Sequence, residues 1–210
     1  MERICCVIDI DGFHLPIDGS TNRYKFFARE LAYVRLSKEY TLLPHSRRFD
    51  LRGKFAMDKL DAKSKLKVNH QIKLTGLSLF PLDDEPVMDD DDIPDLINEI
   101  YARCRTEDMN VIAYKGGIIE KNILKELKIK SVNLESYGCP RFEELIKSPI
   151  SAIKNCGYHR ETTVSVPHCP LAEVTVFRDW VQMQCRYRDS HNEDDDSEST
   201  SEESDSENED

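Results

Sequence analysis

Residues 4–11 read Ile-Cys-Cys-Val-Ile-Asp-Ile-Asp, a nearly continuous apolar run that ends in two acids. Such a run, stopped by Gly12, is typical of a buried strand. Side chains two residues apart on a strand lie on the same face, so Asp9 and Asp11 are expected to lie together. Two carboxylates on one buried face need a cation or a proton. The run therefore predicts a first strand with a candidate metal-binding end, although Asp-x-Asp alone is a weak signal.

Strand and helix signals alternate along the rest of the chain. A second strand is expected over residues 24–36 and a third over 40–43, which with the first indicate an antiparallel meander. The later elements are expected as a helix from Ile93 behind four aspartates, a strand over 109–114, a helix over 119–127, a strand over 131–134, a helix ending near 146 and a helix over 171–183. This order predicts an α/β fold, a mixed β-sheet flanked by helices on both sides, and it resembles ribonuclease-H-like proteins.

The acidity of the chain is concentrated at its C-terminal end. The 210 residues are 39% hydrophobic and 33% charged with a net charge of −11, which fits one domain with a tail. Of the 40 Asp and Glu residues, 12 lie in residues 189–210, which hold no Lys or Arg, so residues 1–188 carry 28 acids against 29 bases. Residues 1–188 are expected to form the folded domain and residues 189–210 a disordered acidic tail. The tail either solvates the domain or binds a basic protein partner.

Three features bear on the compartment of the protein. No run approaches 18 apolar residues, so neither a transmembrane helix nor a membrane partner is expected. The first nine residues lack the cleavage flank of a signal peptide, which indicates a nuclear or cytoplasmic chain. Seven cysteines are an odd number, which favours free thiols or metal ligands over a disulfide framework.

Residues 46–70 are rich in Lys and Arg, with Phe49 and Phe55 between them. This mixture suits a surface that faces the phosphates of a nucleic acid. The candidate nucleic-acid-binding residues are Arg47, Arg48, Arg52 and Lys54. A solvated helix with charged faces explains the segment equally well.

Cysteine and histidine residues cluster in the C-terminal third of the chain. Cys156 and His159 form a Cys-x2-His pair, and Cys169 follows ten positions after His159. These residue types at these spacings are typical of a structural zinc site, which takes four ligands and accepts a carboxylate as one of them. The segment has little hydrophobic reason to be ordered, so a metal would supply what packing cannot. The alternative is that the cysteines are small core residues and the histidines lie on the surface.

His168 and Glu173 flank Cys169 and suit a different chemistry. A histidine five residues before an acid at a helix start can present an imidazole as general base and a carboxylate as metal ligand to one cleft. Glu120 follows the Gly116-Gly117 turn between a strand and a helix and is a further candidate metal ligand. Taken singly, each residue has a plain explanation; Glu120, for example, suits a helix N-terminus because of the helix dipole.

In their order along the chain, these residues resemble the DEDDh exonucleases, which have Asp-x-acid on the first strand, an acid opening a later helix, and His-x4-acid before the last helix. The resemblance implies a metal-dependent 3′–5′ exonuclease that acts on RNA or DNA. Four carboxylates would hold two divalent cations, Mg²⁺ or Mn²⁺, and the histidine would activate water. The catalytic residues carried over in this way are Asp9, Asp11, Glu120, His168 and Glu173.

The zinc pattern narrows the resemblance to the Maelstrom domain and the exonuclease domain of arenaviral nucleoproteins. In both, the last zinc cysteine directly follows the catalytic-position histidine, as Cys169 follows His168 here. Their zinc-binding glutamate lies on the second strand, which implies Glu30 in this chain. The implied ligands of a structural Zn²⁺ are thus Glu30, Cys156, His159 and Cys169.

The sequence departs from the family pattern at three acids. Asp11 stands where the family has Glu, and Glu120 and Glu173 stand where it has Asp. One methylene shifts a carboxylate by about 1 Å, and two-metal sites tolerate little misplacement. Three hypotheses therefore stay open. The chain is an active exonuclease; or it is an inactive, zinc-stapled pseudo-nuclease that binds nucleic acid or protein, like animal Maelstrom domains in RNA silencing; or it is an interaction protein that binds through its acidic tail.

Overall fold

The computed structural model describes residues 1, 3–16, 23–37, 42–54, 58, 60–82, 85–147, 159 and 168–192. The predicted zinc ligand Cys156 and most of the predicted acidic tail lie outside the described residues. None of the helices in the described part of the chain is long and apolar enough to cross a membrane.

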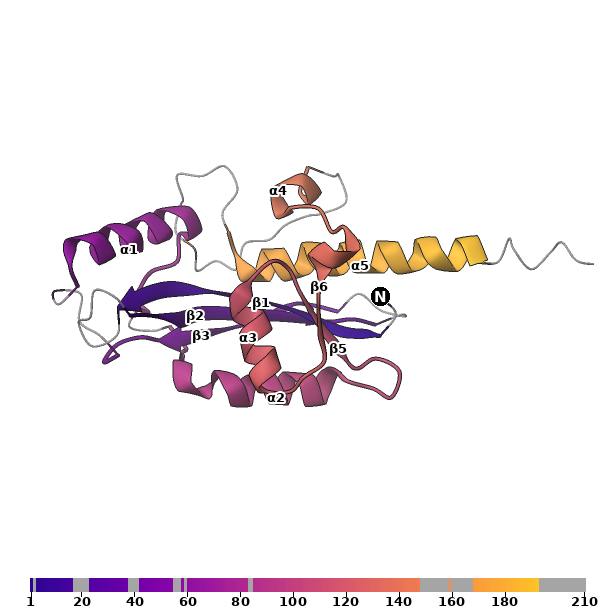
Figure 1. Cartoon of the computed structure of the whole chain (residues 1–210), viewed down its shortest axis with the longest axis horizontal. Helices are drawn as coiled ribbons and strands as arrows, with labels where there is room; N and C mark the ends of the chain where they lie inside the picture. Colours follow the sequence, from indigo (N-terminus) through magenta and orange to yellow (C-terminus); the bar gives the residue numbers. More distant parts are fainter. Residues whose placement is uncertain are drawn as a thin grey trace, which may run out of the picture.

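Six strands form one sheet in the order β4-β3-β2-β1-β5-β6 (Figure 1). They are β1 (Ile4–Pro16), β2 (Tyr24–Arg35), β3 (His45–Asp50), β4 (Met88–Asp89), β5 (Val111–Tyr114) and β6 (Ser131–Asn133). The pairs β1–β2 and β2–β3 are antiparallel, whereas β1–β5, β5–β6 and β3–β4 are parallel. The predicted mixed sheet is therefore confirmed, with β1 in its interior.

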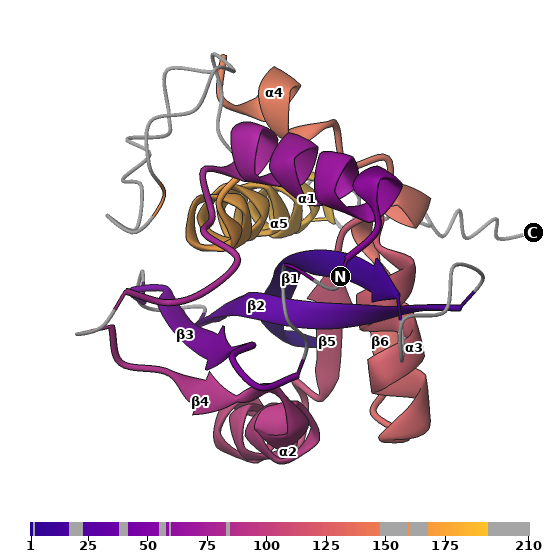
Figure 2. The ribbon, with the colours of Figure 1, turned by 90° about the vertical axis from the view of Figure 1, so that its left-hand side faces the viewer.

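Helices cover both faces of the sheet, as predicted. They are α1 (Ala62–Thr75), α2 (Ile93–Cys104), α3 (Ile118–Glu126), α4 (Phe142–Leu145) and α5 (Pro170–Asn192), with 3₁₀ turns η2 (Asp90–Asp92) and η3 (Leu134–Tyr137). Figure 2 shows α1 and α5 on one side of the sheet and α2 on the other. Val7 of β1 lies in the core cluster of Phe177 on α5, whereas Ile8 lies in the cluster of Ile97 on α2 and Leu124 on α3. Successive strand residues point to opposite faces, so β1 contributes to two separate hydrophobic layers.

Helix α1 begins and ends at residues that satisfy its terminal backbone groups. The Asp61 side chain accepts a hydrogen bond from the Ser64 N–H over 2.6 Å. At the other end Gly76 adopts a left-handed φ of 70°, and its N–H donates to the Ile72 carbonyl. Val68 of α1 is buried in a third cluster that includes Phe13 of β1. These contacts place α1 over the C-terminal half of β1, on the same side as α5.

Three element boundaries differ from those predicted. The first strand does not stop at Gly12 but continues to Pro16, because a bulge between Asp11 and Gly12 lets the pairing with β2 resume. The third strand is β3 at His45–Asp50, directly after Pro44, which has no N–H for a sheet ladder. Of the strand predicted over 40–43, residues 42–43 lie outside any strand, and residues 40–41 are outside the described residues. The last helix does not stop at Met183 but continues to Asn192. Polar residues after Met183 end its apolar stripe, which was the sequence signal, without ending the helical backbone.

Candidate active site

Asp9 and Asp11 project from β1 toward the face of the sheet that α5 covers. They alternate with Ile8 and Ile10, which belong to the core cluster on the α2 side. Asp9 is only 9% exposed. In the β1–β2 register Asp11 lies opposite Glu30, so these two carboxylates share a face. The structure thus gathers the two predicted acids and the predicted zinc ligand Glu30 on one side of neighbouring strands.

A bulge directly after Asp11 fixes this arrangement. The register between β1 and β2 shifts between Asp11 and Gly12. A Cβ atom at Gly12 would lie 2.1 Å from the Phe27 carbonyl oxygen and 2.8 Å from the Ala28 Cα, so no residue other than glycine fits without moving backbone. Bulges re-aim side chains and end regular pairing. Here the bulge sets where Asp11 points.

Glu120 reaches β1 from the first turn of α3. Its Oε1 accepts a hydrogen bond from the Ile10 N–H over 3.1 Å, and the residue is 3% exposed. The helix can begin this close because its N-cap is Gly117, where a Cβ atom would lie 1.8 Å from Glu120 Oε2. The Gly116-Gly117 turn noted in the sequence therefore allows the Glu120 carboxylate to fold back against β1.

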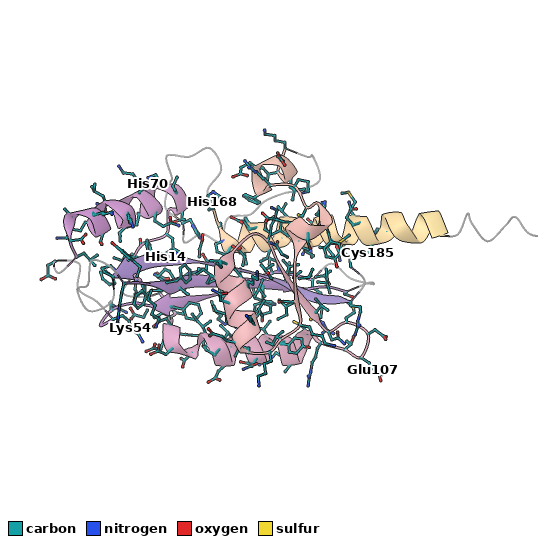
Figure 3. All side chains as sticks on the ribbon, viewed as in Figure 1. His14, Lys54, His70, Glu107, His168 and Cys185 are labelled. Atoms are coloured by element: carbon teal, nitrogen blue, oxygen red, sulfur yellow. The ribbon has the colours of Figure 1, made fainter. Side chains whose placement is uncertain are left out.

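His168 and Glu173 enter the site from the start of α5. His168 Nδ1 lies 3.0 Å from Glu173 Oε1, and its Nε2 lies 3.9 Å from Glu143 Oε1 on α4. The His168 side chain is 45% exposed, whereas that of Glu173 is 14% exposed. Figure 3 shows His168 at the beginning of α5, on the side of the sheet that also carries α1. Glu173 therefore holds Nδ1 of the imidazole, while Nε2 lies on its partly exposed side, near Glu143.

The electrostatics of the site show that its acids act on one another. Burial raises the pKa of Asp9 well above its ordinary value, and the Glu173 and Glu120 carboxylates raise it further. Burial and Glu173 raise the pKa of Asp11 to about 7, although His168 opposes this rise. Burial also raises the pKa of Glu120. At neutral pH this group of carboxylates holds extra protons or requires cations.

The residues present fit a divalent cation in their donor chemistry. Asp11 Oδ2 and Glu120 Oε2 are buried oxygens without a hydrogen-bond partner, and carboxylate oxygens are the ligands that Mg²⁺ and Mn²⁺ prefer. The four carboxylates are nevertheless spaced loosely. Within the described residues, sets of three ligand atoms within 4.8 Å of one another occur only at Glu30–His159–Cys169 and at Asp89–Asp91.

Three of the four predicted zinc ligands meet between β2 and α5. Ligand atoms of Glu30, His159 and Cys169 all lie within 4.8 Å of one another. His159 Nε2 is 2.7 Å from Glu30 Oε2, and His159 Nδ1 hydrogen-bonds to the Thr75 carbonyl at the end of α1. Glu30 and Cys169 are 0% exposed, and Glu30 Oε1 has no hydrogen-bond partner. A nitrogen, a sulfur and an orphaned buried oxygen at this spacing fit Zn²⁺.

The contact of His159 with the main chain determines which of its ring nitrogens faces Glu30. A backbone carbonyl only accepts, so Nδ1 carries the proton that Thr75 receives, and Nε2 is left for Glu30 or a metal. Burial lowers the pKa of His159, but its hydrogen bonds to Cys169 and Glu30 outweigh this and raise it to about 10. The pocket thus favours a positive charge at this point.

The four cations predicted to contact phosphates differ in their exposure and in the acids that surround them. Lys54 Nζ lies 2.7–2.9 Å from carboxylates of Asp89, Asp90 and Asp91, whose hydrogen bonds raise its pKa. Arg52 pairs with Asp50 over 2.8 Å, and Arg48 is 5% exposed, 3.5 Å from Glu85. Arg47 is exposed and borders, with Arg48, a groove of about 430 Å³. Acids of the chain itself therefore engage three of the four.

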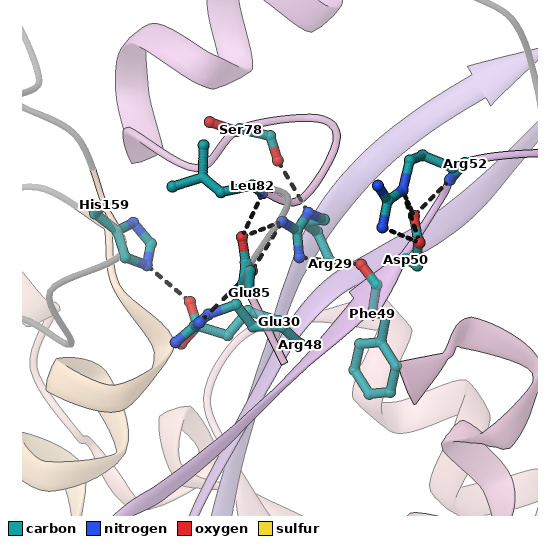
Figure 4. A network of polar contacts seen from close by, with 10 residues as sticks. All are labelled: Arg29, Glu30, Arg48, Phe49, Asp50, Arg52, Ser78, Leu82, Glu85 and His159. Carbon is teal, nitrogen blue, oxygen red and sulfur yellow. Dashed lines mark hydrogen bonds and ion pairs between the residues drawn. The ribbon is translucent and has the colours of Figure 1, made fainter. Parts of the chain in front are cut away.

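Sequence reasoning missed a buried ion pair beside the predicted zinc ligand. Arg29 of β2 is 1% exposed and binds both Glu85 oxygens, at 2.9 and 3.1 Å (Figure 4). It also donates to the Phe49 and Ser78 carbonyls over 3.0 Å each. Burial lowers the pKa of Arg29, and Glu85 opposes this. The pair fastens the segment after α1 to β2 next to Glu30. Since β2 also contains Lys25, Glu30 and Arg35, nothing in the sequence around Arg29 marked it as a buried cation.

No protein-family model matches the sequence, and no curated protein matches it significantly. Some solved structures of exonucleases are similar to it at low identity. One is the 3′-exonuclease in a structure of 3′-end specific recognition of a histone mRNA stem-loop, with 13% identity, a TM-score of 0.46, and coverage of 89% of this chain and 84% of that one. Another is the nuclease domain of 3′hExo, a DEDDh family member bound to rAMP, with 14% identity, a TM-score of 0.44, and coverage of 88% and 93%.

A third similar structure is a moderately thermophilic Exonuclease I from Methylocaldum szegediense. Its identity is 11% and its TM-score 0.45, and the match covers 88% of this chain but 41% of that one. Identities and scores this low do not transfer an activity to the chain. What the chain does must therefore be inferred from its own site.

Proposed function

We propose that this chain is a metal-dependent 3′–5′ exonuclease on a ribonuclease-H-like, DEDDh-type domain, acting on RNA or DNA. The observation that carries the proposal is the convergence of Asp9, Asp11, Glu120 and Glu173 with His168. These residues come from three distant segments of the chain, and the other three carboxylates each raise the pKa of Asp9. Glu173 also raises the pKa of Asp11 and of Glu120. A cluster of buried acids that raise one another's pKa is unfavourable for folding, which makes it a functional-site candidate.

The four carboxylates would hold Mg²⁺ or Mn²⁺, which when bound neutralise charge on the attacking and leaving oxygens of a phosphodiester. The residues of the chain supply the rest. Glu173 orients His168 through Nδ1, and Nε2 can take a proton from a water molecule. The His168 pKa is raised, chiefly by the hydrogen bond to Glu173, so the neutral form that can act as base is favoured only as the pH rises.

Zn²⁺ at Glu30, His159 and Cys169, with Cys156 as the fourth ligand, would hold the α1 end, β2 and the start of α5 together. The proposal is supported by the orphaned Glu30 oxygen and by the burial of all three described ligands. Structural zinc sites of mixed Cys and His ligands stabilise folds whose local packing is insufficient.

The test is a nuclease assay of the purified chain with Mn²⁺ or Mg²⁺, on 3′-labelled and 5′-labelled single- and double-stranded RNA and DNA. We expect 3′-terminal nucleotides to be released, and Asp9→Asn and His168→Gln each to lower kcat about 100-fold or more. Asp108→Asn, in an exposed loop, is the matched control and should leave the rate unchanged.

Native mass spectrometry of the same sample measures whether one zinc ion is bound. A chain that carries zinc but degrades no substrate with either cation would contradict the exonuclease proposal. Such a result would favour the alternative, a domain stabilised by zinc that binds nucleic acid or protein and hydrolyses neither. A chain without zinc that still degrades RNA would contradict only the structural zinc site.

A further inference from the structure

One face of α1 presents three lysines and a histidine, without acids. Lys63, Lys67, His70 and Lys73 are all exposed. Their spacings of four, three and three residues place them along one side of a helix with 3.6 residues per turn. Residues 62–75 contain no Asp or Glu. These four residues are called the α1 stripe below.

The stripe has no acid of its own to balance it. In the segment before α1, by contrast, Lys54 faces Asp89 and Arg52 faces Asp50. Across the described residues, no carboxylate forms an ion pair with a member of the stripe. Asp61, at the start of the helix, is engaged as N-cap by the Ser64 N–H, and the charge of Lys63 helps to lower its pKa. Lys67 lies over the Tyr24 ring, 4.4 Å from its centroid, and this contact leaves its charge without a carboxylate. The positive charge of Lys67 and Lys73 is therefore available to an external anion.

The stripe also leads toward the candidate active site. The ten residue steps from Lys63 to Lys73 span about 15 Å of helix axis. At the C-terminal end, the Thr75 carbonyl contacts His159, His159 contacts Glu30, and Glu30 lies opposite Asp11. Figure 3 shows His70 on α1 and His168, just before α5, on the same side of the sheet. A strand bound along α1 would thus approach the carboxylates from the side that His168 occupies.

We infer that the α1 stripe binds the sugar–phosphate backbone of a nucleic-acid substrate and leads its end toward Asp9 and Asp11. Regularly spaced, uncompensated cations match a chain of phosphates and read no sequence. Leu66, 70% exposed between them, adds an apolar surface for a base or sugar. The inference rests on the proposed exonuclease function and assigns its substrate path to α1 instead of Arg48, Arg52 and Lys54.

The test compares the full chain with a variant that carries Lys63→Gln, Lys67→Gln and Lys73→Gln. Fluorescence anisotropy of a labelled oligouridylate, without added divalent cation, measures binding apart from hydrolysis. Each phosphate contact contributes about 0.7 to the slope of log affinity against log salt for a single strand, so the variant should lose about 2 units of slope. The affinity should fall roughly 10- to 100-fold at 0.1 M salt. Glutamine keeps the helix propensity, so circular dichroism should not change.

The matched control carries Lys121→Gln, Lys125→Gln and Lys130→Gln, which are exposed residues of α3 and its C-terminal flank, on the opposite side of the sheet. It removes the same charge and should leave the slope unchanged. Equal losses in both variants, or no loss in the α1 variant, would overturn the inference. So would tighter binding of a synthetic peptide of residues 193–210 to the stripe, which would make the acidic tail its ligand.

The two proposals fail in different ways. If the chain hydrolyses RNA but the α1 substitutions leave its affinity for RNA unchanged, the exonuclease proposal stands and the inference about the α1 stripe is wrong. If the α1 substitutions weaken RNA binding but the chain hydrolyses no substrate, the inference about the α1 stripe stands and the exonuclease proposal is wrong.

Discussion

Replacing Asp11 by Asn should stabilise the chain at neutral pH when no Mn²⁺ or Mg²⁺ is added. The folded state raises the Asp11 pKa from 3.8 to about 7, because the carboxylate is buried and faces Glu173. A shift of this size corresponds to roughly 4 kcal/mol at most, since each unit is about 1.4 kcal/mol. The folded chain holds the proton of Asp11 more tightly than the unfolded chain does. The resulting loss in the free energy of unfolding is therefore absent below pH 3.8, grows as the pH rises, and is complete above about pH 7.

The measurement is urea unfolding of the wild-type and Asp11→Asn chains at pH 4 and pH 7.5, with and without Mn²⁺. We expect the variant to gain about 2 kcal/mol at the higher pH without added metal, half of the upper bound because the site relaxes, and little at the lower pH. Mn²⁺ should stabilise the wild type and not the variant, because a bound cation favours the state that holds it. Asp108→Asn is the control for a surface acid. A variant that loses stability equally at both pH values, or that keeps the Mn²⁺ effect, would refute the assignment of Asp11 as a ligand forced into an unfavourable environment.

Three further changes test other parts of the structure. Glu30→Gln should lower the zinc content in native mass spectrometry and the midpoint of thermal unfolding, because it removes a charged ligand from a buried site; an unchanged zinc content would place the metal elsewhere. Glu85→Gln should cost about 3–5 kcal/mol in denaturant unfolding, because it leaves Arg29 buried without its anion, and Arg29→Met in the same chain should recover part of that loss. Gly12→Ala should destabilise the chain by at least about 2 kcal/mol, since its Cβ would overlap the Phe27 carbonyl; a neutral effect in the same assay would show that the bulge is not rigid.

The parts of the fold that the sequence predicted are those with strong local signals. The β1 run is continuous and apolar, and α2 carries a buried stripe at Ile93, Leu96, Ile97 and Ile100 behind its acidic start. The strand β4 was not predicted because two residues, Met88 and Asp89, form it by pairing with β3. A pairing of this length leaves no periodicity in the sequence.

The candidate site likewise contains residues that a local sequence pattern predicts and residues that no local pattern predicts. Asp9, Asp11 and Glu120 are found from local patterns, an Asp-x-Asp at a strand end and an acid after a Gly-Gly turn. Glu30 lies in a strand with several other charged residues and was identified through a family resemblance alone. Arg29 and Glu85 are 56 positions apart in sequence, and nothing local to either residue predicts that they pair. Long-range polar contacts depend on topology, which residue-level patterns do not contain.

The register of β1 against β2 places a residue of the proposed catalytic site, Asp11, opposite a residue of the proposed zinc site, Glu30. A slip of β2 by a single residue against β1 would turn Glu30 to the far side while Asp11 stayed on the side of α5, because side chains alternate along a strand. The metal proposed for support would then lose its ligand on β2, and the two proposed sites would no longer share a face of the sheet. A residue inserted or deleted within either strand is therefore tolerated only where a bulge absorbs it, so both sites depend on one register.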